Sequence, residues 1–383
     1  MSRSRHVIAV ICRFDWDFYR ALLQGVCDFG RETGHRVFPG DLTKQSRFWG
    51  DETTAIIYDG VNDRVRRWVR AKQLPAVDVS GYSRYRPAIK VRPDDEAITE
   101  LVVDHFVGKG LRHLGYVGIS GVGYSEVRRD LFKRRVEASG TDYHEFIGER
   151  PDQARPFNDP RDPPAVRWLK RAPKPIGLFV CNDDRAVRLL EQCRRAGLRV
   201  PEDVAVVGVD NDMIHVIAAN PPLSTVDVGA RRIGFEAARI LIELAANPAA
   251  AADRIVSVKP VGLIARQSSD ILAISDTVVA AAIRYIREHV SEGLRVKHLA
   301  AVTDLSRRSL EQRFRAAIGR SPSEEIRHVQ LGLARQLLAG TSIDMAAIAQ
   351  QTGFSSARQF GATFQAHLGT TPTAYRKQFA VSA

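Results

Sequence analysis

The sequence predicts an α/β fold with two parallel sheets, followed by an all-α domain that carries two helix-turn-helix motifs. Three observations predict this arrangement. Short apolar runs alternate with helical patterns over the first 270 residues, which is typical of parallel sheets covered by helices on both faces. The length of 383 residues suits two such sheets and a further domain. Near the C-terminus, one helical pattern recurs at an offset of 50 residues.

The α/β region begins with an apolar strand over Val7–Cys12 and a helix around Asp17–Gly34. The segments that follow keep this alternation, and their strands are too continuously apolar to have one face in water. The further predicted strands are Thr54–Tyr58, Ala76–Ser80, Leu114–Ile119, Ile176–Cys181 and Val204–Val209, and the further predicted helices are Asp94–Gly110, Ser125–Gly140 and Arg185–Gly197.

Polar and aromatic side chains follow the predicted strands, where parallel sheets bind their ligands. Carboxylates and amides accept hydrogen bonds from hydroxyl groups, arginine donates to them, and a flat ring covers an apolar C–H face. The set therefore predicts a cleft for a polyhydroxylated ligand, although Asp and Asn after a strand can instead cap the next helix. The residues of this set are Arg13, Asp15, Trp16, Asp59, Tyr124, Arg128, Asn182, Asp183, Asp210, Asn211 and Asp212.

Several motifs resemble the periplasmic-binding-protein-like effector domain of LacI-type repressors over residues 6–268. They lie at Phe179–Ala186, Gly197–Asp210, Pro221–Val226 and Leu263–Ser268, and the segment Asp94–His105 fits the same family. The resemblance implies two Rossmann-like subdomains with a sugar in the cleft between them. The N-terminal helix-turn-helix of that family is absent, so DNA binding must come from elsewhere. The predicted effector-binding residues are Asp15, Trp16, Asp94, Tyr124, Arg128, Asn182, Asp183 and Asp210.

The repeat in the tail pairs Phe314-x-Ala316-x-Ile318-Gly319-x-Ser321-Pro322 with Phe364-x-Ala366-x-Leu368-Gly369-x-Thr371-Pro372. Each copy predicts an N-capped helix that ends at glycine and is followed by proline. A short helical segment precedes each copy, at Val296–Val302 and Met345–Thr352. A short helix, a tight turn and a capped helix form a helix-turn-helix, whose second helix enters the DNA major groove.

Helical periodicity separates a core face from a polar face in each copy. The core positions are Leu310, Phe314 and Ile318 in the first copy and Phe360, Phe364 and Leu368 in the second. The polar face could be merely solvated, but its occurrence in two equivalent helices favours DNA contact. Arg, Gln and Glu can read base edges, whereas Arg315, Arg320 and Arg376 are expected at phosphates. The predicted DNA-binding residues are Arg307, Arg308, Glu311, Gln312, Arg315, Arg358, Gln359 and Arg376.

The tail resembles the AraC-type DNA-binding domain, through Leu299-Ala300, Leu305-Ser306, Ile348-Ala349 and Gly353-Phe354 in addition to the repeat. Residues 269–275 are predicted as a linker and 276–379 as this domain, which begins with an amphipathic helix over Asp276–Val290. Asp304 stands where the first turn usually has glycine, and Asp tolerates a left-handed turn. The second helix has Gly361 and Ala362 on its outer face, so we expect the first helix to supply most base readout. Both modules together resemble activators of xylose operons.

Composition narrows the functional class. The net charge is +12, and residues 271–383 hold 14 Lys and Arg against 8 Asp and Glu, which suits a polyanionic partner. The four cysteines are scattered, and no signal peptide or membrane-spanning run is present, so we expect a cytoplasmic protein that contacts no membrane. Gly118-Ile-Ser-Gly-Val122 departs from the G-x-S-x-G elbow, and no metal or cofactor motif is found. We expect no enzyme, no cofactor and no metal.

These observations predict a sugar-responsive transcription regulator, and specifically an activator of a pentose (xylose-like) catabolic operon. The expected partners are double-stranded operator DNA, a small sugar, RNA polymerase and a second copy of the chain in a homodimer. A repressor, or a regulator that responds to another sugar or a polyol, remains an alternative. So does a sugar-binding protein or enzyme with no role on DNA.

Overall fold

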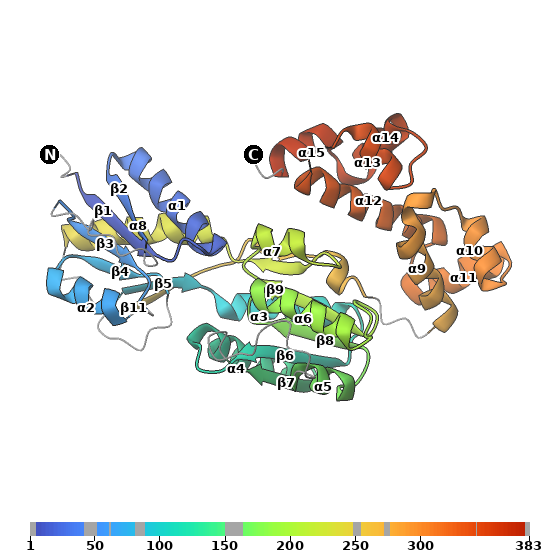
Figure 1. The fold of residues 1–383 in the computed structure, drawn as a ribbon, viewed down its shortest axis with the longest axis horizontal. Helices are drawn as coiled ribbons and strands as arrows, with labels where there is room; N and C mark the ends of the chain where they lie inside the picture. Colours follow the sequence, from blue (N-terminus) through green and yellow to red (C-terminus); the bar gives the residue numbers. More distant parts are fainter. Residues whose placement is uncertain are drawn as a thin grey trace. The chain divides into compact units, whose positions relative to one another are not determined.

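The computed structural model describes residues 5–41, 52–60, 63–80, 89–149, 164–247, 254–271, 276–341 and 343–379. The chain divides into two compact units, residues 1–271 and 272–383 (Figure 1). This division falls within the segment that we predicted as a linker, of which residues 272–275 lie outside the described residues. The first unit is α/β and the second is entirely helical in its described part, as the sequence predicted.

The first unit contains two six-stranded sheets. The first sheet has the strand order β11-β5-β4-β3-β1-β2, and all its strand pairs are parallel. Two helices that are far apart in the sequence, α1 and α8, bury their apolar sides on one face, and α2 covers the other. The elements are β1 (Val7–Cys12), β2 (Arg36–Asp41), β3 (Ala55–Tyr58), β4 (Ala76–Asp78), β5 (Ile89–Pro93), β11 (Arg254–Val258), α1 (Asp17–Thr33), α2 (Asp63–Lys72) and α8 (Ala230–Ala246).

The second sheet has the order β12-β10-β9-β8-β6-β7 and is parallel except for β12, which runs antiparallel to β10. Helices α3 and α4 pack on one face, and α5 and α6 on the other. The elements are β6 (His113–Ile119), β7 (Asp142–Gly148), β8 (Ile176–Val180), β9 (Val204–Val209), β10 (Ser224–Asp227), β12 (Gly262–Ile264), α3 (Asp95–Gly108), α4 (Gly123–Ala138), α5 (Pro164–Arg171), α6 (Asp183–Arg195) and α7 (Met213–Ala218).

The chain passes between the two sheets three times, after β5, after β10 and after β11. Backbone hydrogen bonds tie these crossings together. The Asp94 amide donates to the Val258 carbonyl at 2.9 Å, and the Val261 amide donates to the Asp227 carbonyl at 2.8 Å. Each sheet therefore forms a subdomain of its own, and the three crossings form a hinge between the two subdomains.

The second unit contains two small cores, one for each half of the sequence repeat. The repeated helices are α11 (Arg307–Ile318) and α14 (Ala357–Leu368), each of 12 residues. Ser306 and Ser356 cap their first turns, and a left-handed glycine ends each helix. The predicted repeat is thus present as two equivalent structures. The other helices are α9 (Thr277–His289), α10 (Val296–Thr303), α12 (Pro322–Gly340), α13 (Met345–Gln351) and α15 (Pro372–Phe379).

The described part of the chain contains neither a membrane-spanning helix nor a cluster of metal ligands. None of its helices is both long enough and apolar enough to cross a bilayer. Nor does any group of three or more His, Cys, Asp or Glu side chains there have the arrangement of a metal site.

Candidate effector cleft and DNA-binding helices

Asp210 lies at the carboxyl end of the buried strand β9, where the backbone turns sharply. Its φ is 112°, which is a strained value for a residue with a side chain. Its carboxyl group makes no hydrogen bond or ion pair with any described residue. Burial raises the pKa of Asp210 to about 7, opposed by Arg128 and reinforced by Asp212 and Asp95. An acceptor held without a partner is free to bind a ligand hydroxyl.

Arg128 belongs to helix α4 and is almost fully buried. Its charge acts on Asp210, which follows β9. Its Nε donates to Asp95 Oδ1 at 2.8 Å, and its Nη1 donates to the Cys181 carbonyl at 2.6 Å. The Tyr124 ring lies 5.3 Å from the guanidinium, in a cation–π contact. These contacts join α3, α4 and the end of β8 around one cation. The arginine is thereby held rigidly, which suits a ligand-binding group.

Asn182 and Asp94 both cap helices, so the capping role that competed with ligand binding is present at both residues. The Asn182 side-chain oxygen accepts from the Arg185 amide at 3.0 Å, and the Asp94 oxygen accepts from the Ala97 amide at 3.0 Å. Asn182 also uses its Nδ2 group, which donates to Tyr124 Oη at 3.2 Å. Asn182 therefore lies with Tyr124 and Arg128 at the predicted cleft. Asp94 lies at the hinge instead, and its ligand role stays a prediction.

Asp183 is buried, with 1% of its surface exposed, and both its oxygens are bound within the protein. Oδ1 accepts from Thr225 Oγ1 at 2.7 Å, and Oδ2 accepts from the Asp212 amide at 2.9 Å. Burial raises the pKa of Asp183 well above its usual value, and the neighbouring Asp210 adds to this shift. The carboxyl group joins the segments that follow β8 and β9 to the start of β10, so its predicted contact with an effector would have to share atoms already in use.

The first sheet contributes Arg13, Trp16 and Asp59 at the ends of β1 and β3. The Arg13 guanidinium lies 4.6 Å from the centre of the Trp16 ring, and its Nε lies 4.0 Å from Asp59 Oδ2. Trp16 also begins helix α1. Asp15 is exposed in the preceding turn. The predicted residues therefore come from both subdomains, and Arg13 orients the one aromatic ring of this set on the first sheet.

Three residues that the sequence analysis did not select, Asp95, Asp17 and His215, make further contacts around the predicted cleft. Asp95, next to the predicted Asp94, holds Arg128, and the choice between these adjacent carboxylates could not be made from spacing. Asp17 Oδ2 accepts from the Met213 amide at 3.2 Å, a bond between the two subdomains. His215 lies between Asp184 and Asp212, which raise its pKa to about 10 by hydrogen bonding. His215 is therefore a cation at neutral pH.

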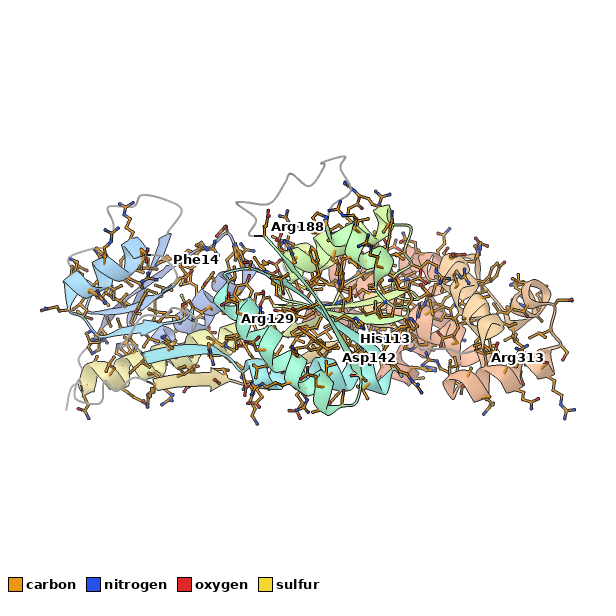
Figure 2. All side chains as sticks on the ribbon, turned by 90° about the horizontal axis from the view of Figure 1, so that it is seen from below. Phe14, His113, Arg129, Asp142, Arg188 and Arg313 are labelled. Atoms are coloured by element: carbon orange, nitrogen blue, oxygen red, sulfur yellow. The ribbon has the colours of Figure 1, made fainter. Side chains whose placement is uncertain are left out.

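Helix α11 presents the predicted DNA-binding side chains on its exposed face. Arg307, Arg308, Gln312 and Arg315 are exposed, whereas Leu310 and Phe314 are fully buried. Arg307 Nε donates to Glu311 Oε1 at 3.0 Å, so these two charges neutralise each other in the absence of DNA. Arg308 has no hydrogen-bond or ion-pair partner among the described residues. On the opposite side, Arg313 (labelled in Figure 2) donates to Asp276. This hydrogen bond, of 2.6 Å, fixes α11 to the start of α9.

Helix α14 presents Arg358 and Gln359 in the same way. The Gln359 side-chain oxygen is occupied, because it accepts from the Ser355 amide at 3.0 Å and from the Ser355 hydroxyl at 2.6 Å. Two residues expected at phosphates also have structural roles. Arg320 pairs with the buried Glu325, and Arg376 donates to the Ile343 carbonyl at 2.6 Å. For these three residues DNA contact stays a prediction, and any such contact would compete with existing bonds.

Comparisons with known proteins match both units. Residues 103–269 match the model of a periplasmic binding protein-like domain, and residues 299–378 match that of a helix-turn-helix domain. The xylose operon regulatory protein of Escherichia coli strain K12 is 26% identical over 390 residues, covering 98% of each chain. The solved structure of a xylose-binding transcription activator, XylR, covers 100% of both chains with a TM-score of 0.78 at 25% identity.

The chain is an AraC-type transcription regulator with a periplasmic-binding-protein-like domain. The matched proteins are regulators of transcription and not enzymes. The regulator also resembles the transcriptional repressor PurR of Aliivibrio fischeri strain ES114, at 24% identity over 239 residues, but that likeness covers only 59% of the chain. The xylose operon regulatory protein and the XylR structure, in contrast, match the chain over both modules.

Proposed function

We propose that this regulator is a sugar-responsive activator of a pentose catabolic operon, with xylose or a related pentose as its effector. One observation carries the proposal: the likeness to a xylose operon regulatory protein extends over 98% of both chains, so it includes the effector cleft and the DNA-binding helices together. The chemistry of the cleft agrees with a sugar. An unpartnered carboxylate, a buried guanidinium, an amide and a tryptophan ring offer acceptors, donors and an apolar face to a small polyol.

The proposed mechanism uses the hinge. The sugar enters between the subdomains, Asp210 and Arg128 bind its hydroxyl groups from the second sheet, and Trp16 covers it from the first. Binding favours the closed arrangement only to the extent that the sugar binds this state more tightly. In a cytoplasmic homodimer, closure would re-space the two DNA-binding domains over a pair of operator half-sites and place the regulator beside RNA polymerase.

The effector is tested by a thermal-shift screen of the purified protein against pentoses, hexoses and polyols. A ligand that binds only the folded state raises stability by RT ln(1+[L]/Kd), about 2.7 kcal/mol at 100 times Kd. We expect D-xylose to give a shift that Asp210→Ala abolishes. Asp104→Ala, which removes an exposed carboxylate of the same subdomain, is the matched control and should retain the shift. A hexose or polyol that shifts the protein in place of all pentoses would replace the proposed effector.

The DNA role is tested with promoter fragments from the protein's own genomic neighbourhood. We expect Asp210→Ala to bind such a fragment as well as the unmodified protein does, while losing the response to sugar. Failure to retain any fragment, with and without sugar, would refute the regulatory function. A repressor is the second candidate, because the effector domain also resembles that of PurR. Deleting the gene distinguishes them: loss of an activator prevents expression of the operon on xylose, and loss of a repressor makes it constitutive.

A further inference from the structure

A hollow of about 570 Å³ lies at the edge of the second sheet, between strand β7 and helix α5. Side chains two residues apart on a strand point to the same face, so His144 and Phe146 share the face of β7 that α5 covers. The Phe146 and Trp168 rings lie 5.7 Å apart and form the aromatic part of the lining, with Pro173 beside them. A volume of this size is ordinary for a small-molecule site, roughly 300–1,000 Å³.

The charged part of the lining has one sign. Arg167 and Arg171, one helical turn apart on α5, lie at the hollow and are exposed. The described residues that line it include no Asp or Glu. Arg171 has no hydrogen-bond or ion-pair partner among the described residues. The hollow therefore combines flat apolar rings with the positive charge of Arg171, which no described residue pairs, and this suits an anion attached to a ring.

A buried polar atom gives an independent indication of a ligand. His144 lines the hollow, and its Nε2 atom is buried without a hydrogen-bond partner in the described structure. Burial lowers the pKa of His144, and the neighbouring His113 adds to this effect, so the ring is neutral at neutral pH. His113 Nδ1 lies 3.1 Å from Asp142 Oδ2, where β6 and β7 begin, and Figure 2 labels both residues. A neutral imidazole left unsatisfied gains stability when a ligand supplies the missing hydrogen bond.

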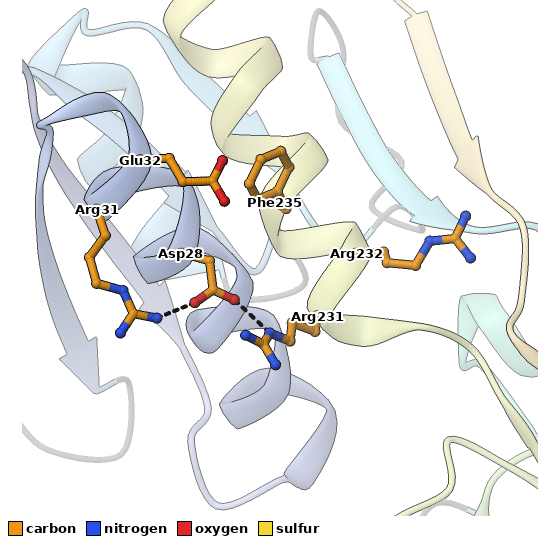
Figure 3. Close-up of a pocket in the computed structure, with 6 residues that line it drawn as sticks. All are labelled: Asp28, Arg31, Glu32, Arg231, Arg232 and Phe235. Atoms are coloured by element: carbon orange, nitrogen blue, oxygen red, sulfur yellow. Dashed lines mark hydrogen bonds and ion pairs between the residues drawn. The ribbon is translucent and has the colours of Figure 1, made fainter. Parts of the chain in front are cut away.

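A second hollow, between α1 and α8, lacks these properties (Figure 3). Asp28 lies between Arg31 and Arg231 and accepts hydrogen bonds from both. Glu32 adds another carboxylate to the lining. Its positive charges are thus largely neutralised within the protein, and it provides a comparison for the hollow at β7.

We propose that the hollow between β7 and α5 is a second ligand site of this regulator, for a small flat aromatic or heteroaromatic anion. The ring lies against Trp168 and Phe146, the carboxylate or phosphate binds Arg171, and a polar ring atom bonds His144 Nε2. The site is separate from the sugar cleft, because its lining comes from β7, from α5 and from the residues just before β8, whereas Asn182 and Asp210 follow the carboxyl ends of β8 and β9. It does not depend on the identity of the sugar.

The test uses the full-length protein and isothermal titration with three probes: 1-naphthyl phosphate, 2-naphthoate and the neutral 2-naphthalenemethanol. We expect one or both anions to bind, and the neutral probe to bind at least about tenfold more weakly, since the ionic contact is lost. Arg171→Gln should weaken the anion about tenfold without affecting folding, because this side chain is exposed. Arg232→Gln, an exposed arginine at the hollow between α1 and α8, is the matched control and should bind like the unmodified protein.

Two further variants test the ring and the imidazole. Trp168→Phe keeps an aromatic surface and should retain most of the affinity, whereas His144→Phe should lose part of it. Preference for the phosphate or for the carboxylate would identify the anionic group. The proposal is overturned if neither anion binds at millimolar concentration, or if Arg171→Gln and Arg232→Gln reduce the affinity equally.

Discussion

At the scale of single residues, Asp210 concentrates the properties expected of an effector contact. Its backbone is strained, with a φ of 112°, and no described residue binds its carboxyl group. Strain of this kind persists only where the surrounding structure fixes it, and it is found at functional sites. Asn211, the next residue, also has a positive φ of 55°. The turn after β9 is therefore shaped to present the carboxyl group rather than to satisfy it.

The pKa of Asp210, about 7, predicts that sugar affinity depends on pH. Sugar hydroxyls donate to the ionised carboxylate, whose fraction rises from about one tenth at pH 6 to about nine tenths at pH 8. We expect the affinity for the effector to rise about tenfold over this range. His215, with a pKa of about 10, stays charged throughout and does not contribute. The measurement is isothermal titration at pH 6, 7 and 8.

Asp210→Asn is the control for this pH dependence, since an amide cannot ionise, and its affinity should be flat over the same range. The free energy of unfolding depends on pH with the opposite sign. The folded protein binds the Asp210 proton more tightly than the unfolded chain does. The stability contributed by this proton is therefore present at low pH and is lost as pH rises through about 7. A wild-type affinity that is the same at pH 6 and pH 8 would contradict the ligand role of the ionised carboxylate.

The sequence predicted a set of polar residues after the strands as cleft residues, but it could not divide their roles. Asn182 and Asp94 both follow strands, and both cap helices, yet only Asn182 also contacts another predicted cleft residue, Tyr124. Asp95 is adjacent to Asp94 and carries the ion pair with Arg128. Which of two neighbouring carboxylates points inward depends on the direction in which α3 leaves the hinge. That direction is set by tertiary packing and by no local pattern.

At the scale of elements, the crossing of α1 and α8 depends on two glycines. A Cβ atom on Gly25 would lie 1.8 Å from the Arg231 carbonyl oxygen, and one on Gly234 would lie 1.9 Å from that of Leu22. The two helices are therefore in backbone contact beneath the first sheet. The sequence pattern did not indicate this contact, because α8 was not among the predicted elements. A glycine inside a helical pattern normally counts against a helix, since it destabilises the helix relative to alanine.

We expect Gly234→Ala to destabilise the first unit by about 1–3 kcal/mol or more, because the helices must separate to admit the methyl group. In an exposed helix the same change would stabilise by about 1 kcal/mol, so the contact decides the sign. The measurement is urea denaturation. Gly108→Ala, at a helical glycine with no atom within 4 Å of the added methyl group, is the control and should not destabilise. Equal stability of the two variants would mean that the crossing adapts freely.

The two recognition helices give the second prediction at this scale. Arg308 on α11 is exposed and without a partner, whereas α14 carries Gly361 and Ala362 on its outer face. We expect Arg308→Ala to weaken specific operator binding by about 1–3 kcal/mol and to relax the base preference at one position. Arg358→Ala should weaken specific and non-specific binding more evenly. Fluorescence anisotropy on specific and scrambled duplexes measures both, and equal loss of base preference in the two variants would contradict unequal roles.

The elements that the sequence predicted well are those with a strong local signal. β1 and β9 have the predicted bounds, because each is a continuous apolar run that is buried on both faces. The repeated helices were identified by their caps and terminal glycines. The strands β2, β5, β7, β10, β11 and β12 were not predicted. Of these, β11 and β12 are short and half exposed, and β12 pairs antiparallel across a crossing that only the tertiary fold determines. The third crossing of the hinge connects β11 to β12.

At the scale of the whole molecule, two compact units share one chain, and regulation requires that each influences the other. Binding of sugar and of DNA then becomes a linked pair of equilibria. If the sugar changes the affinity for operator DNA by some factor, thermodynamics requires that operator DNA changes the affinity for the sugar by the same factor. The factor is typically about 5–150, corresponding to about 1–3 kcal/mol. This reciprocity does not depend on how the two units are arranged.

We therefore expect the xylose affinity of the protein saturated with operator DNA to exceed that of the free protein by the same factor by which xylose raises its DNA affinity. Titration of sugar with and without an operator duplex gives one factor, and anisotropy of the duplex with and without sugar gives the other.

Arg308→Ala should weaken DNA binding and leave the factor unchanged, because it acts on one ligand only. Asp210→Ala should lose the factor together with sugar binding. Two measured factors that differ beyond error would mean that sugar and DNA do not act on a common equilibrium, and a factor of one would mean that the cleft does not control the DNA-binding helices.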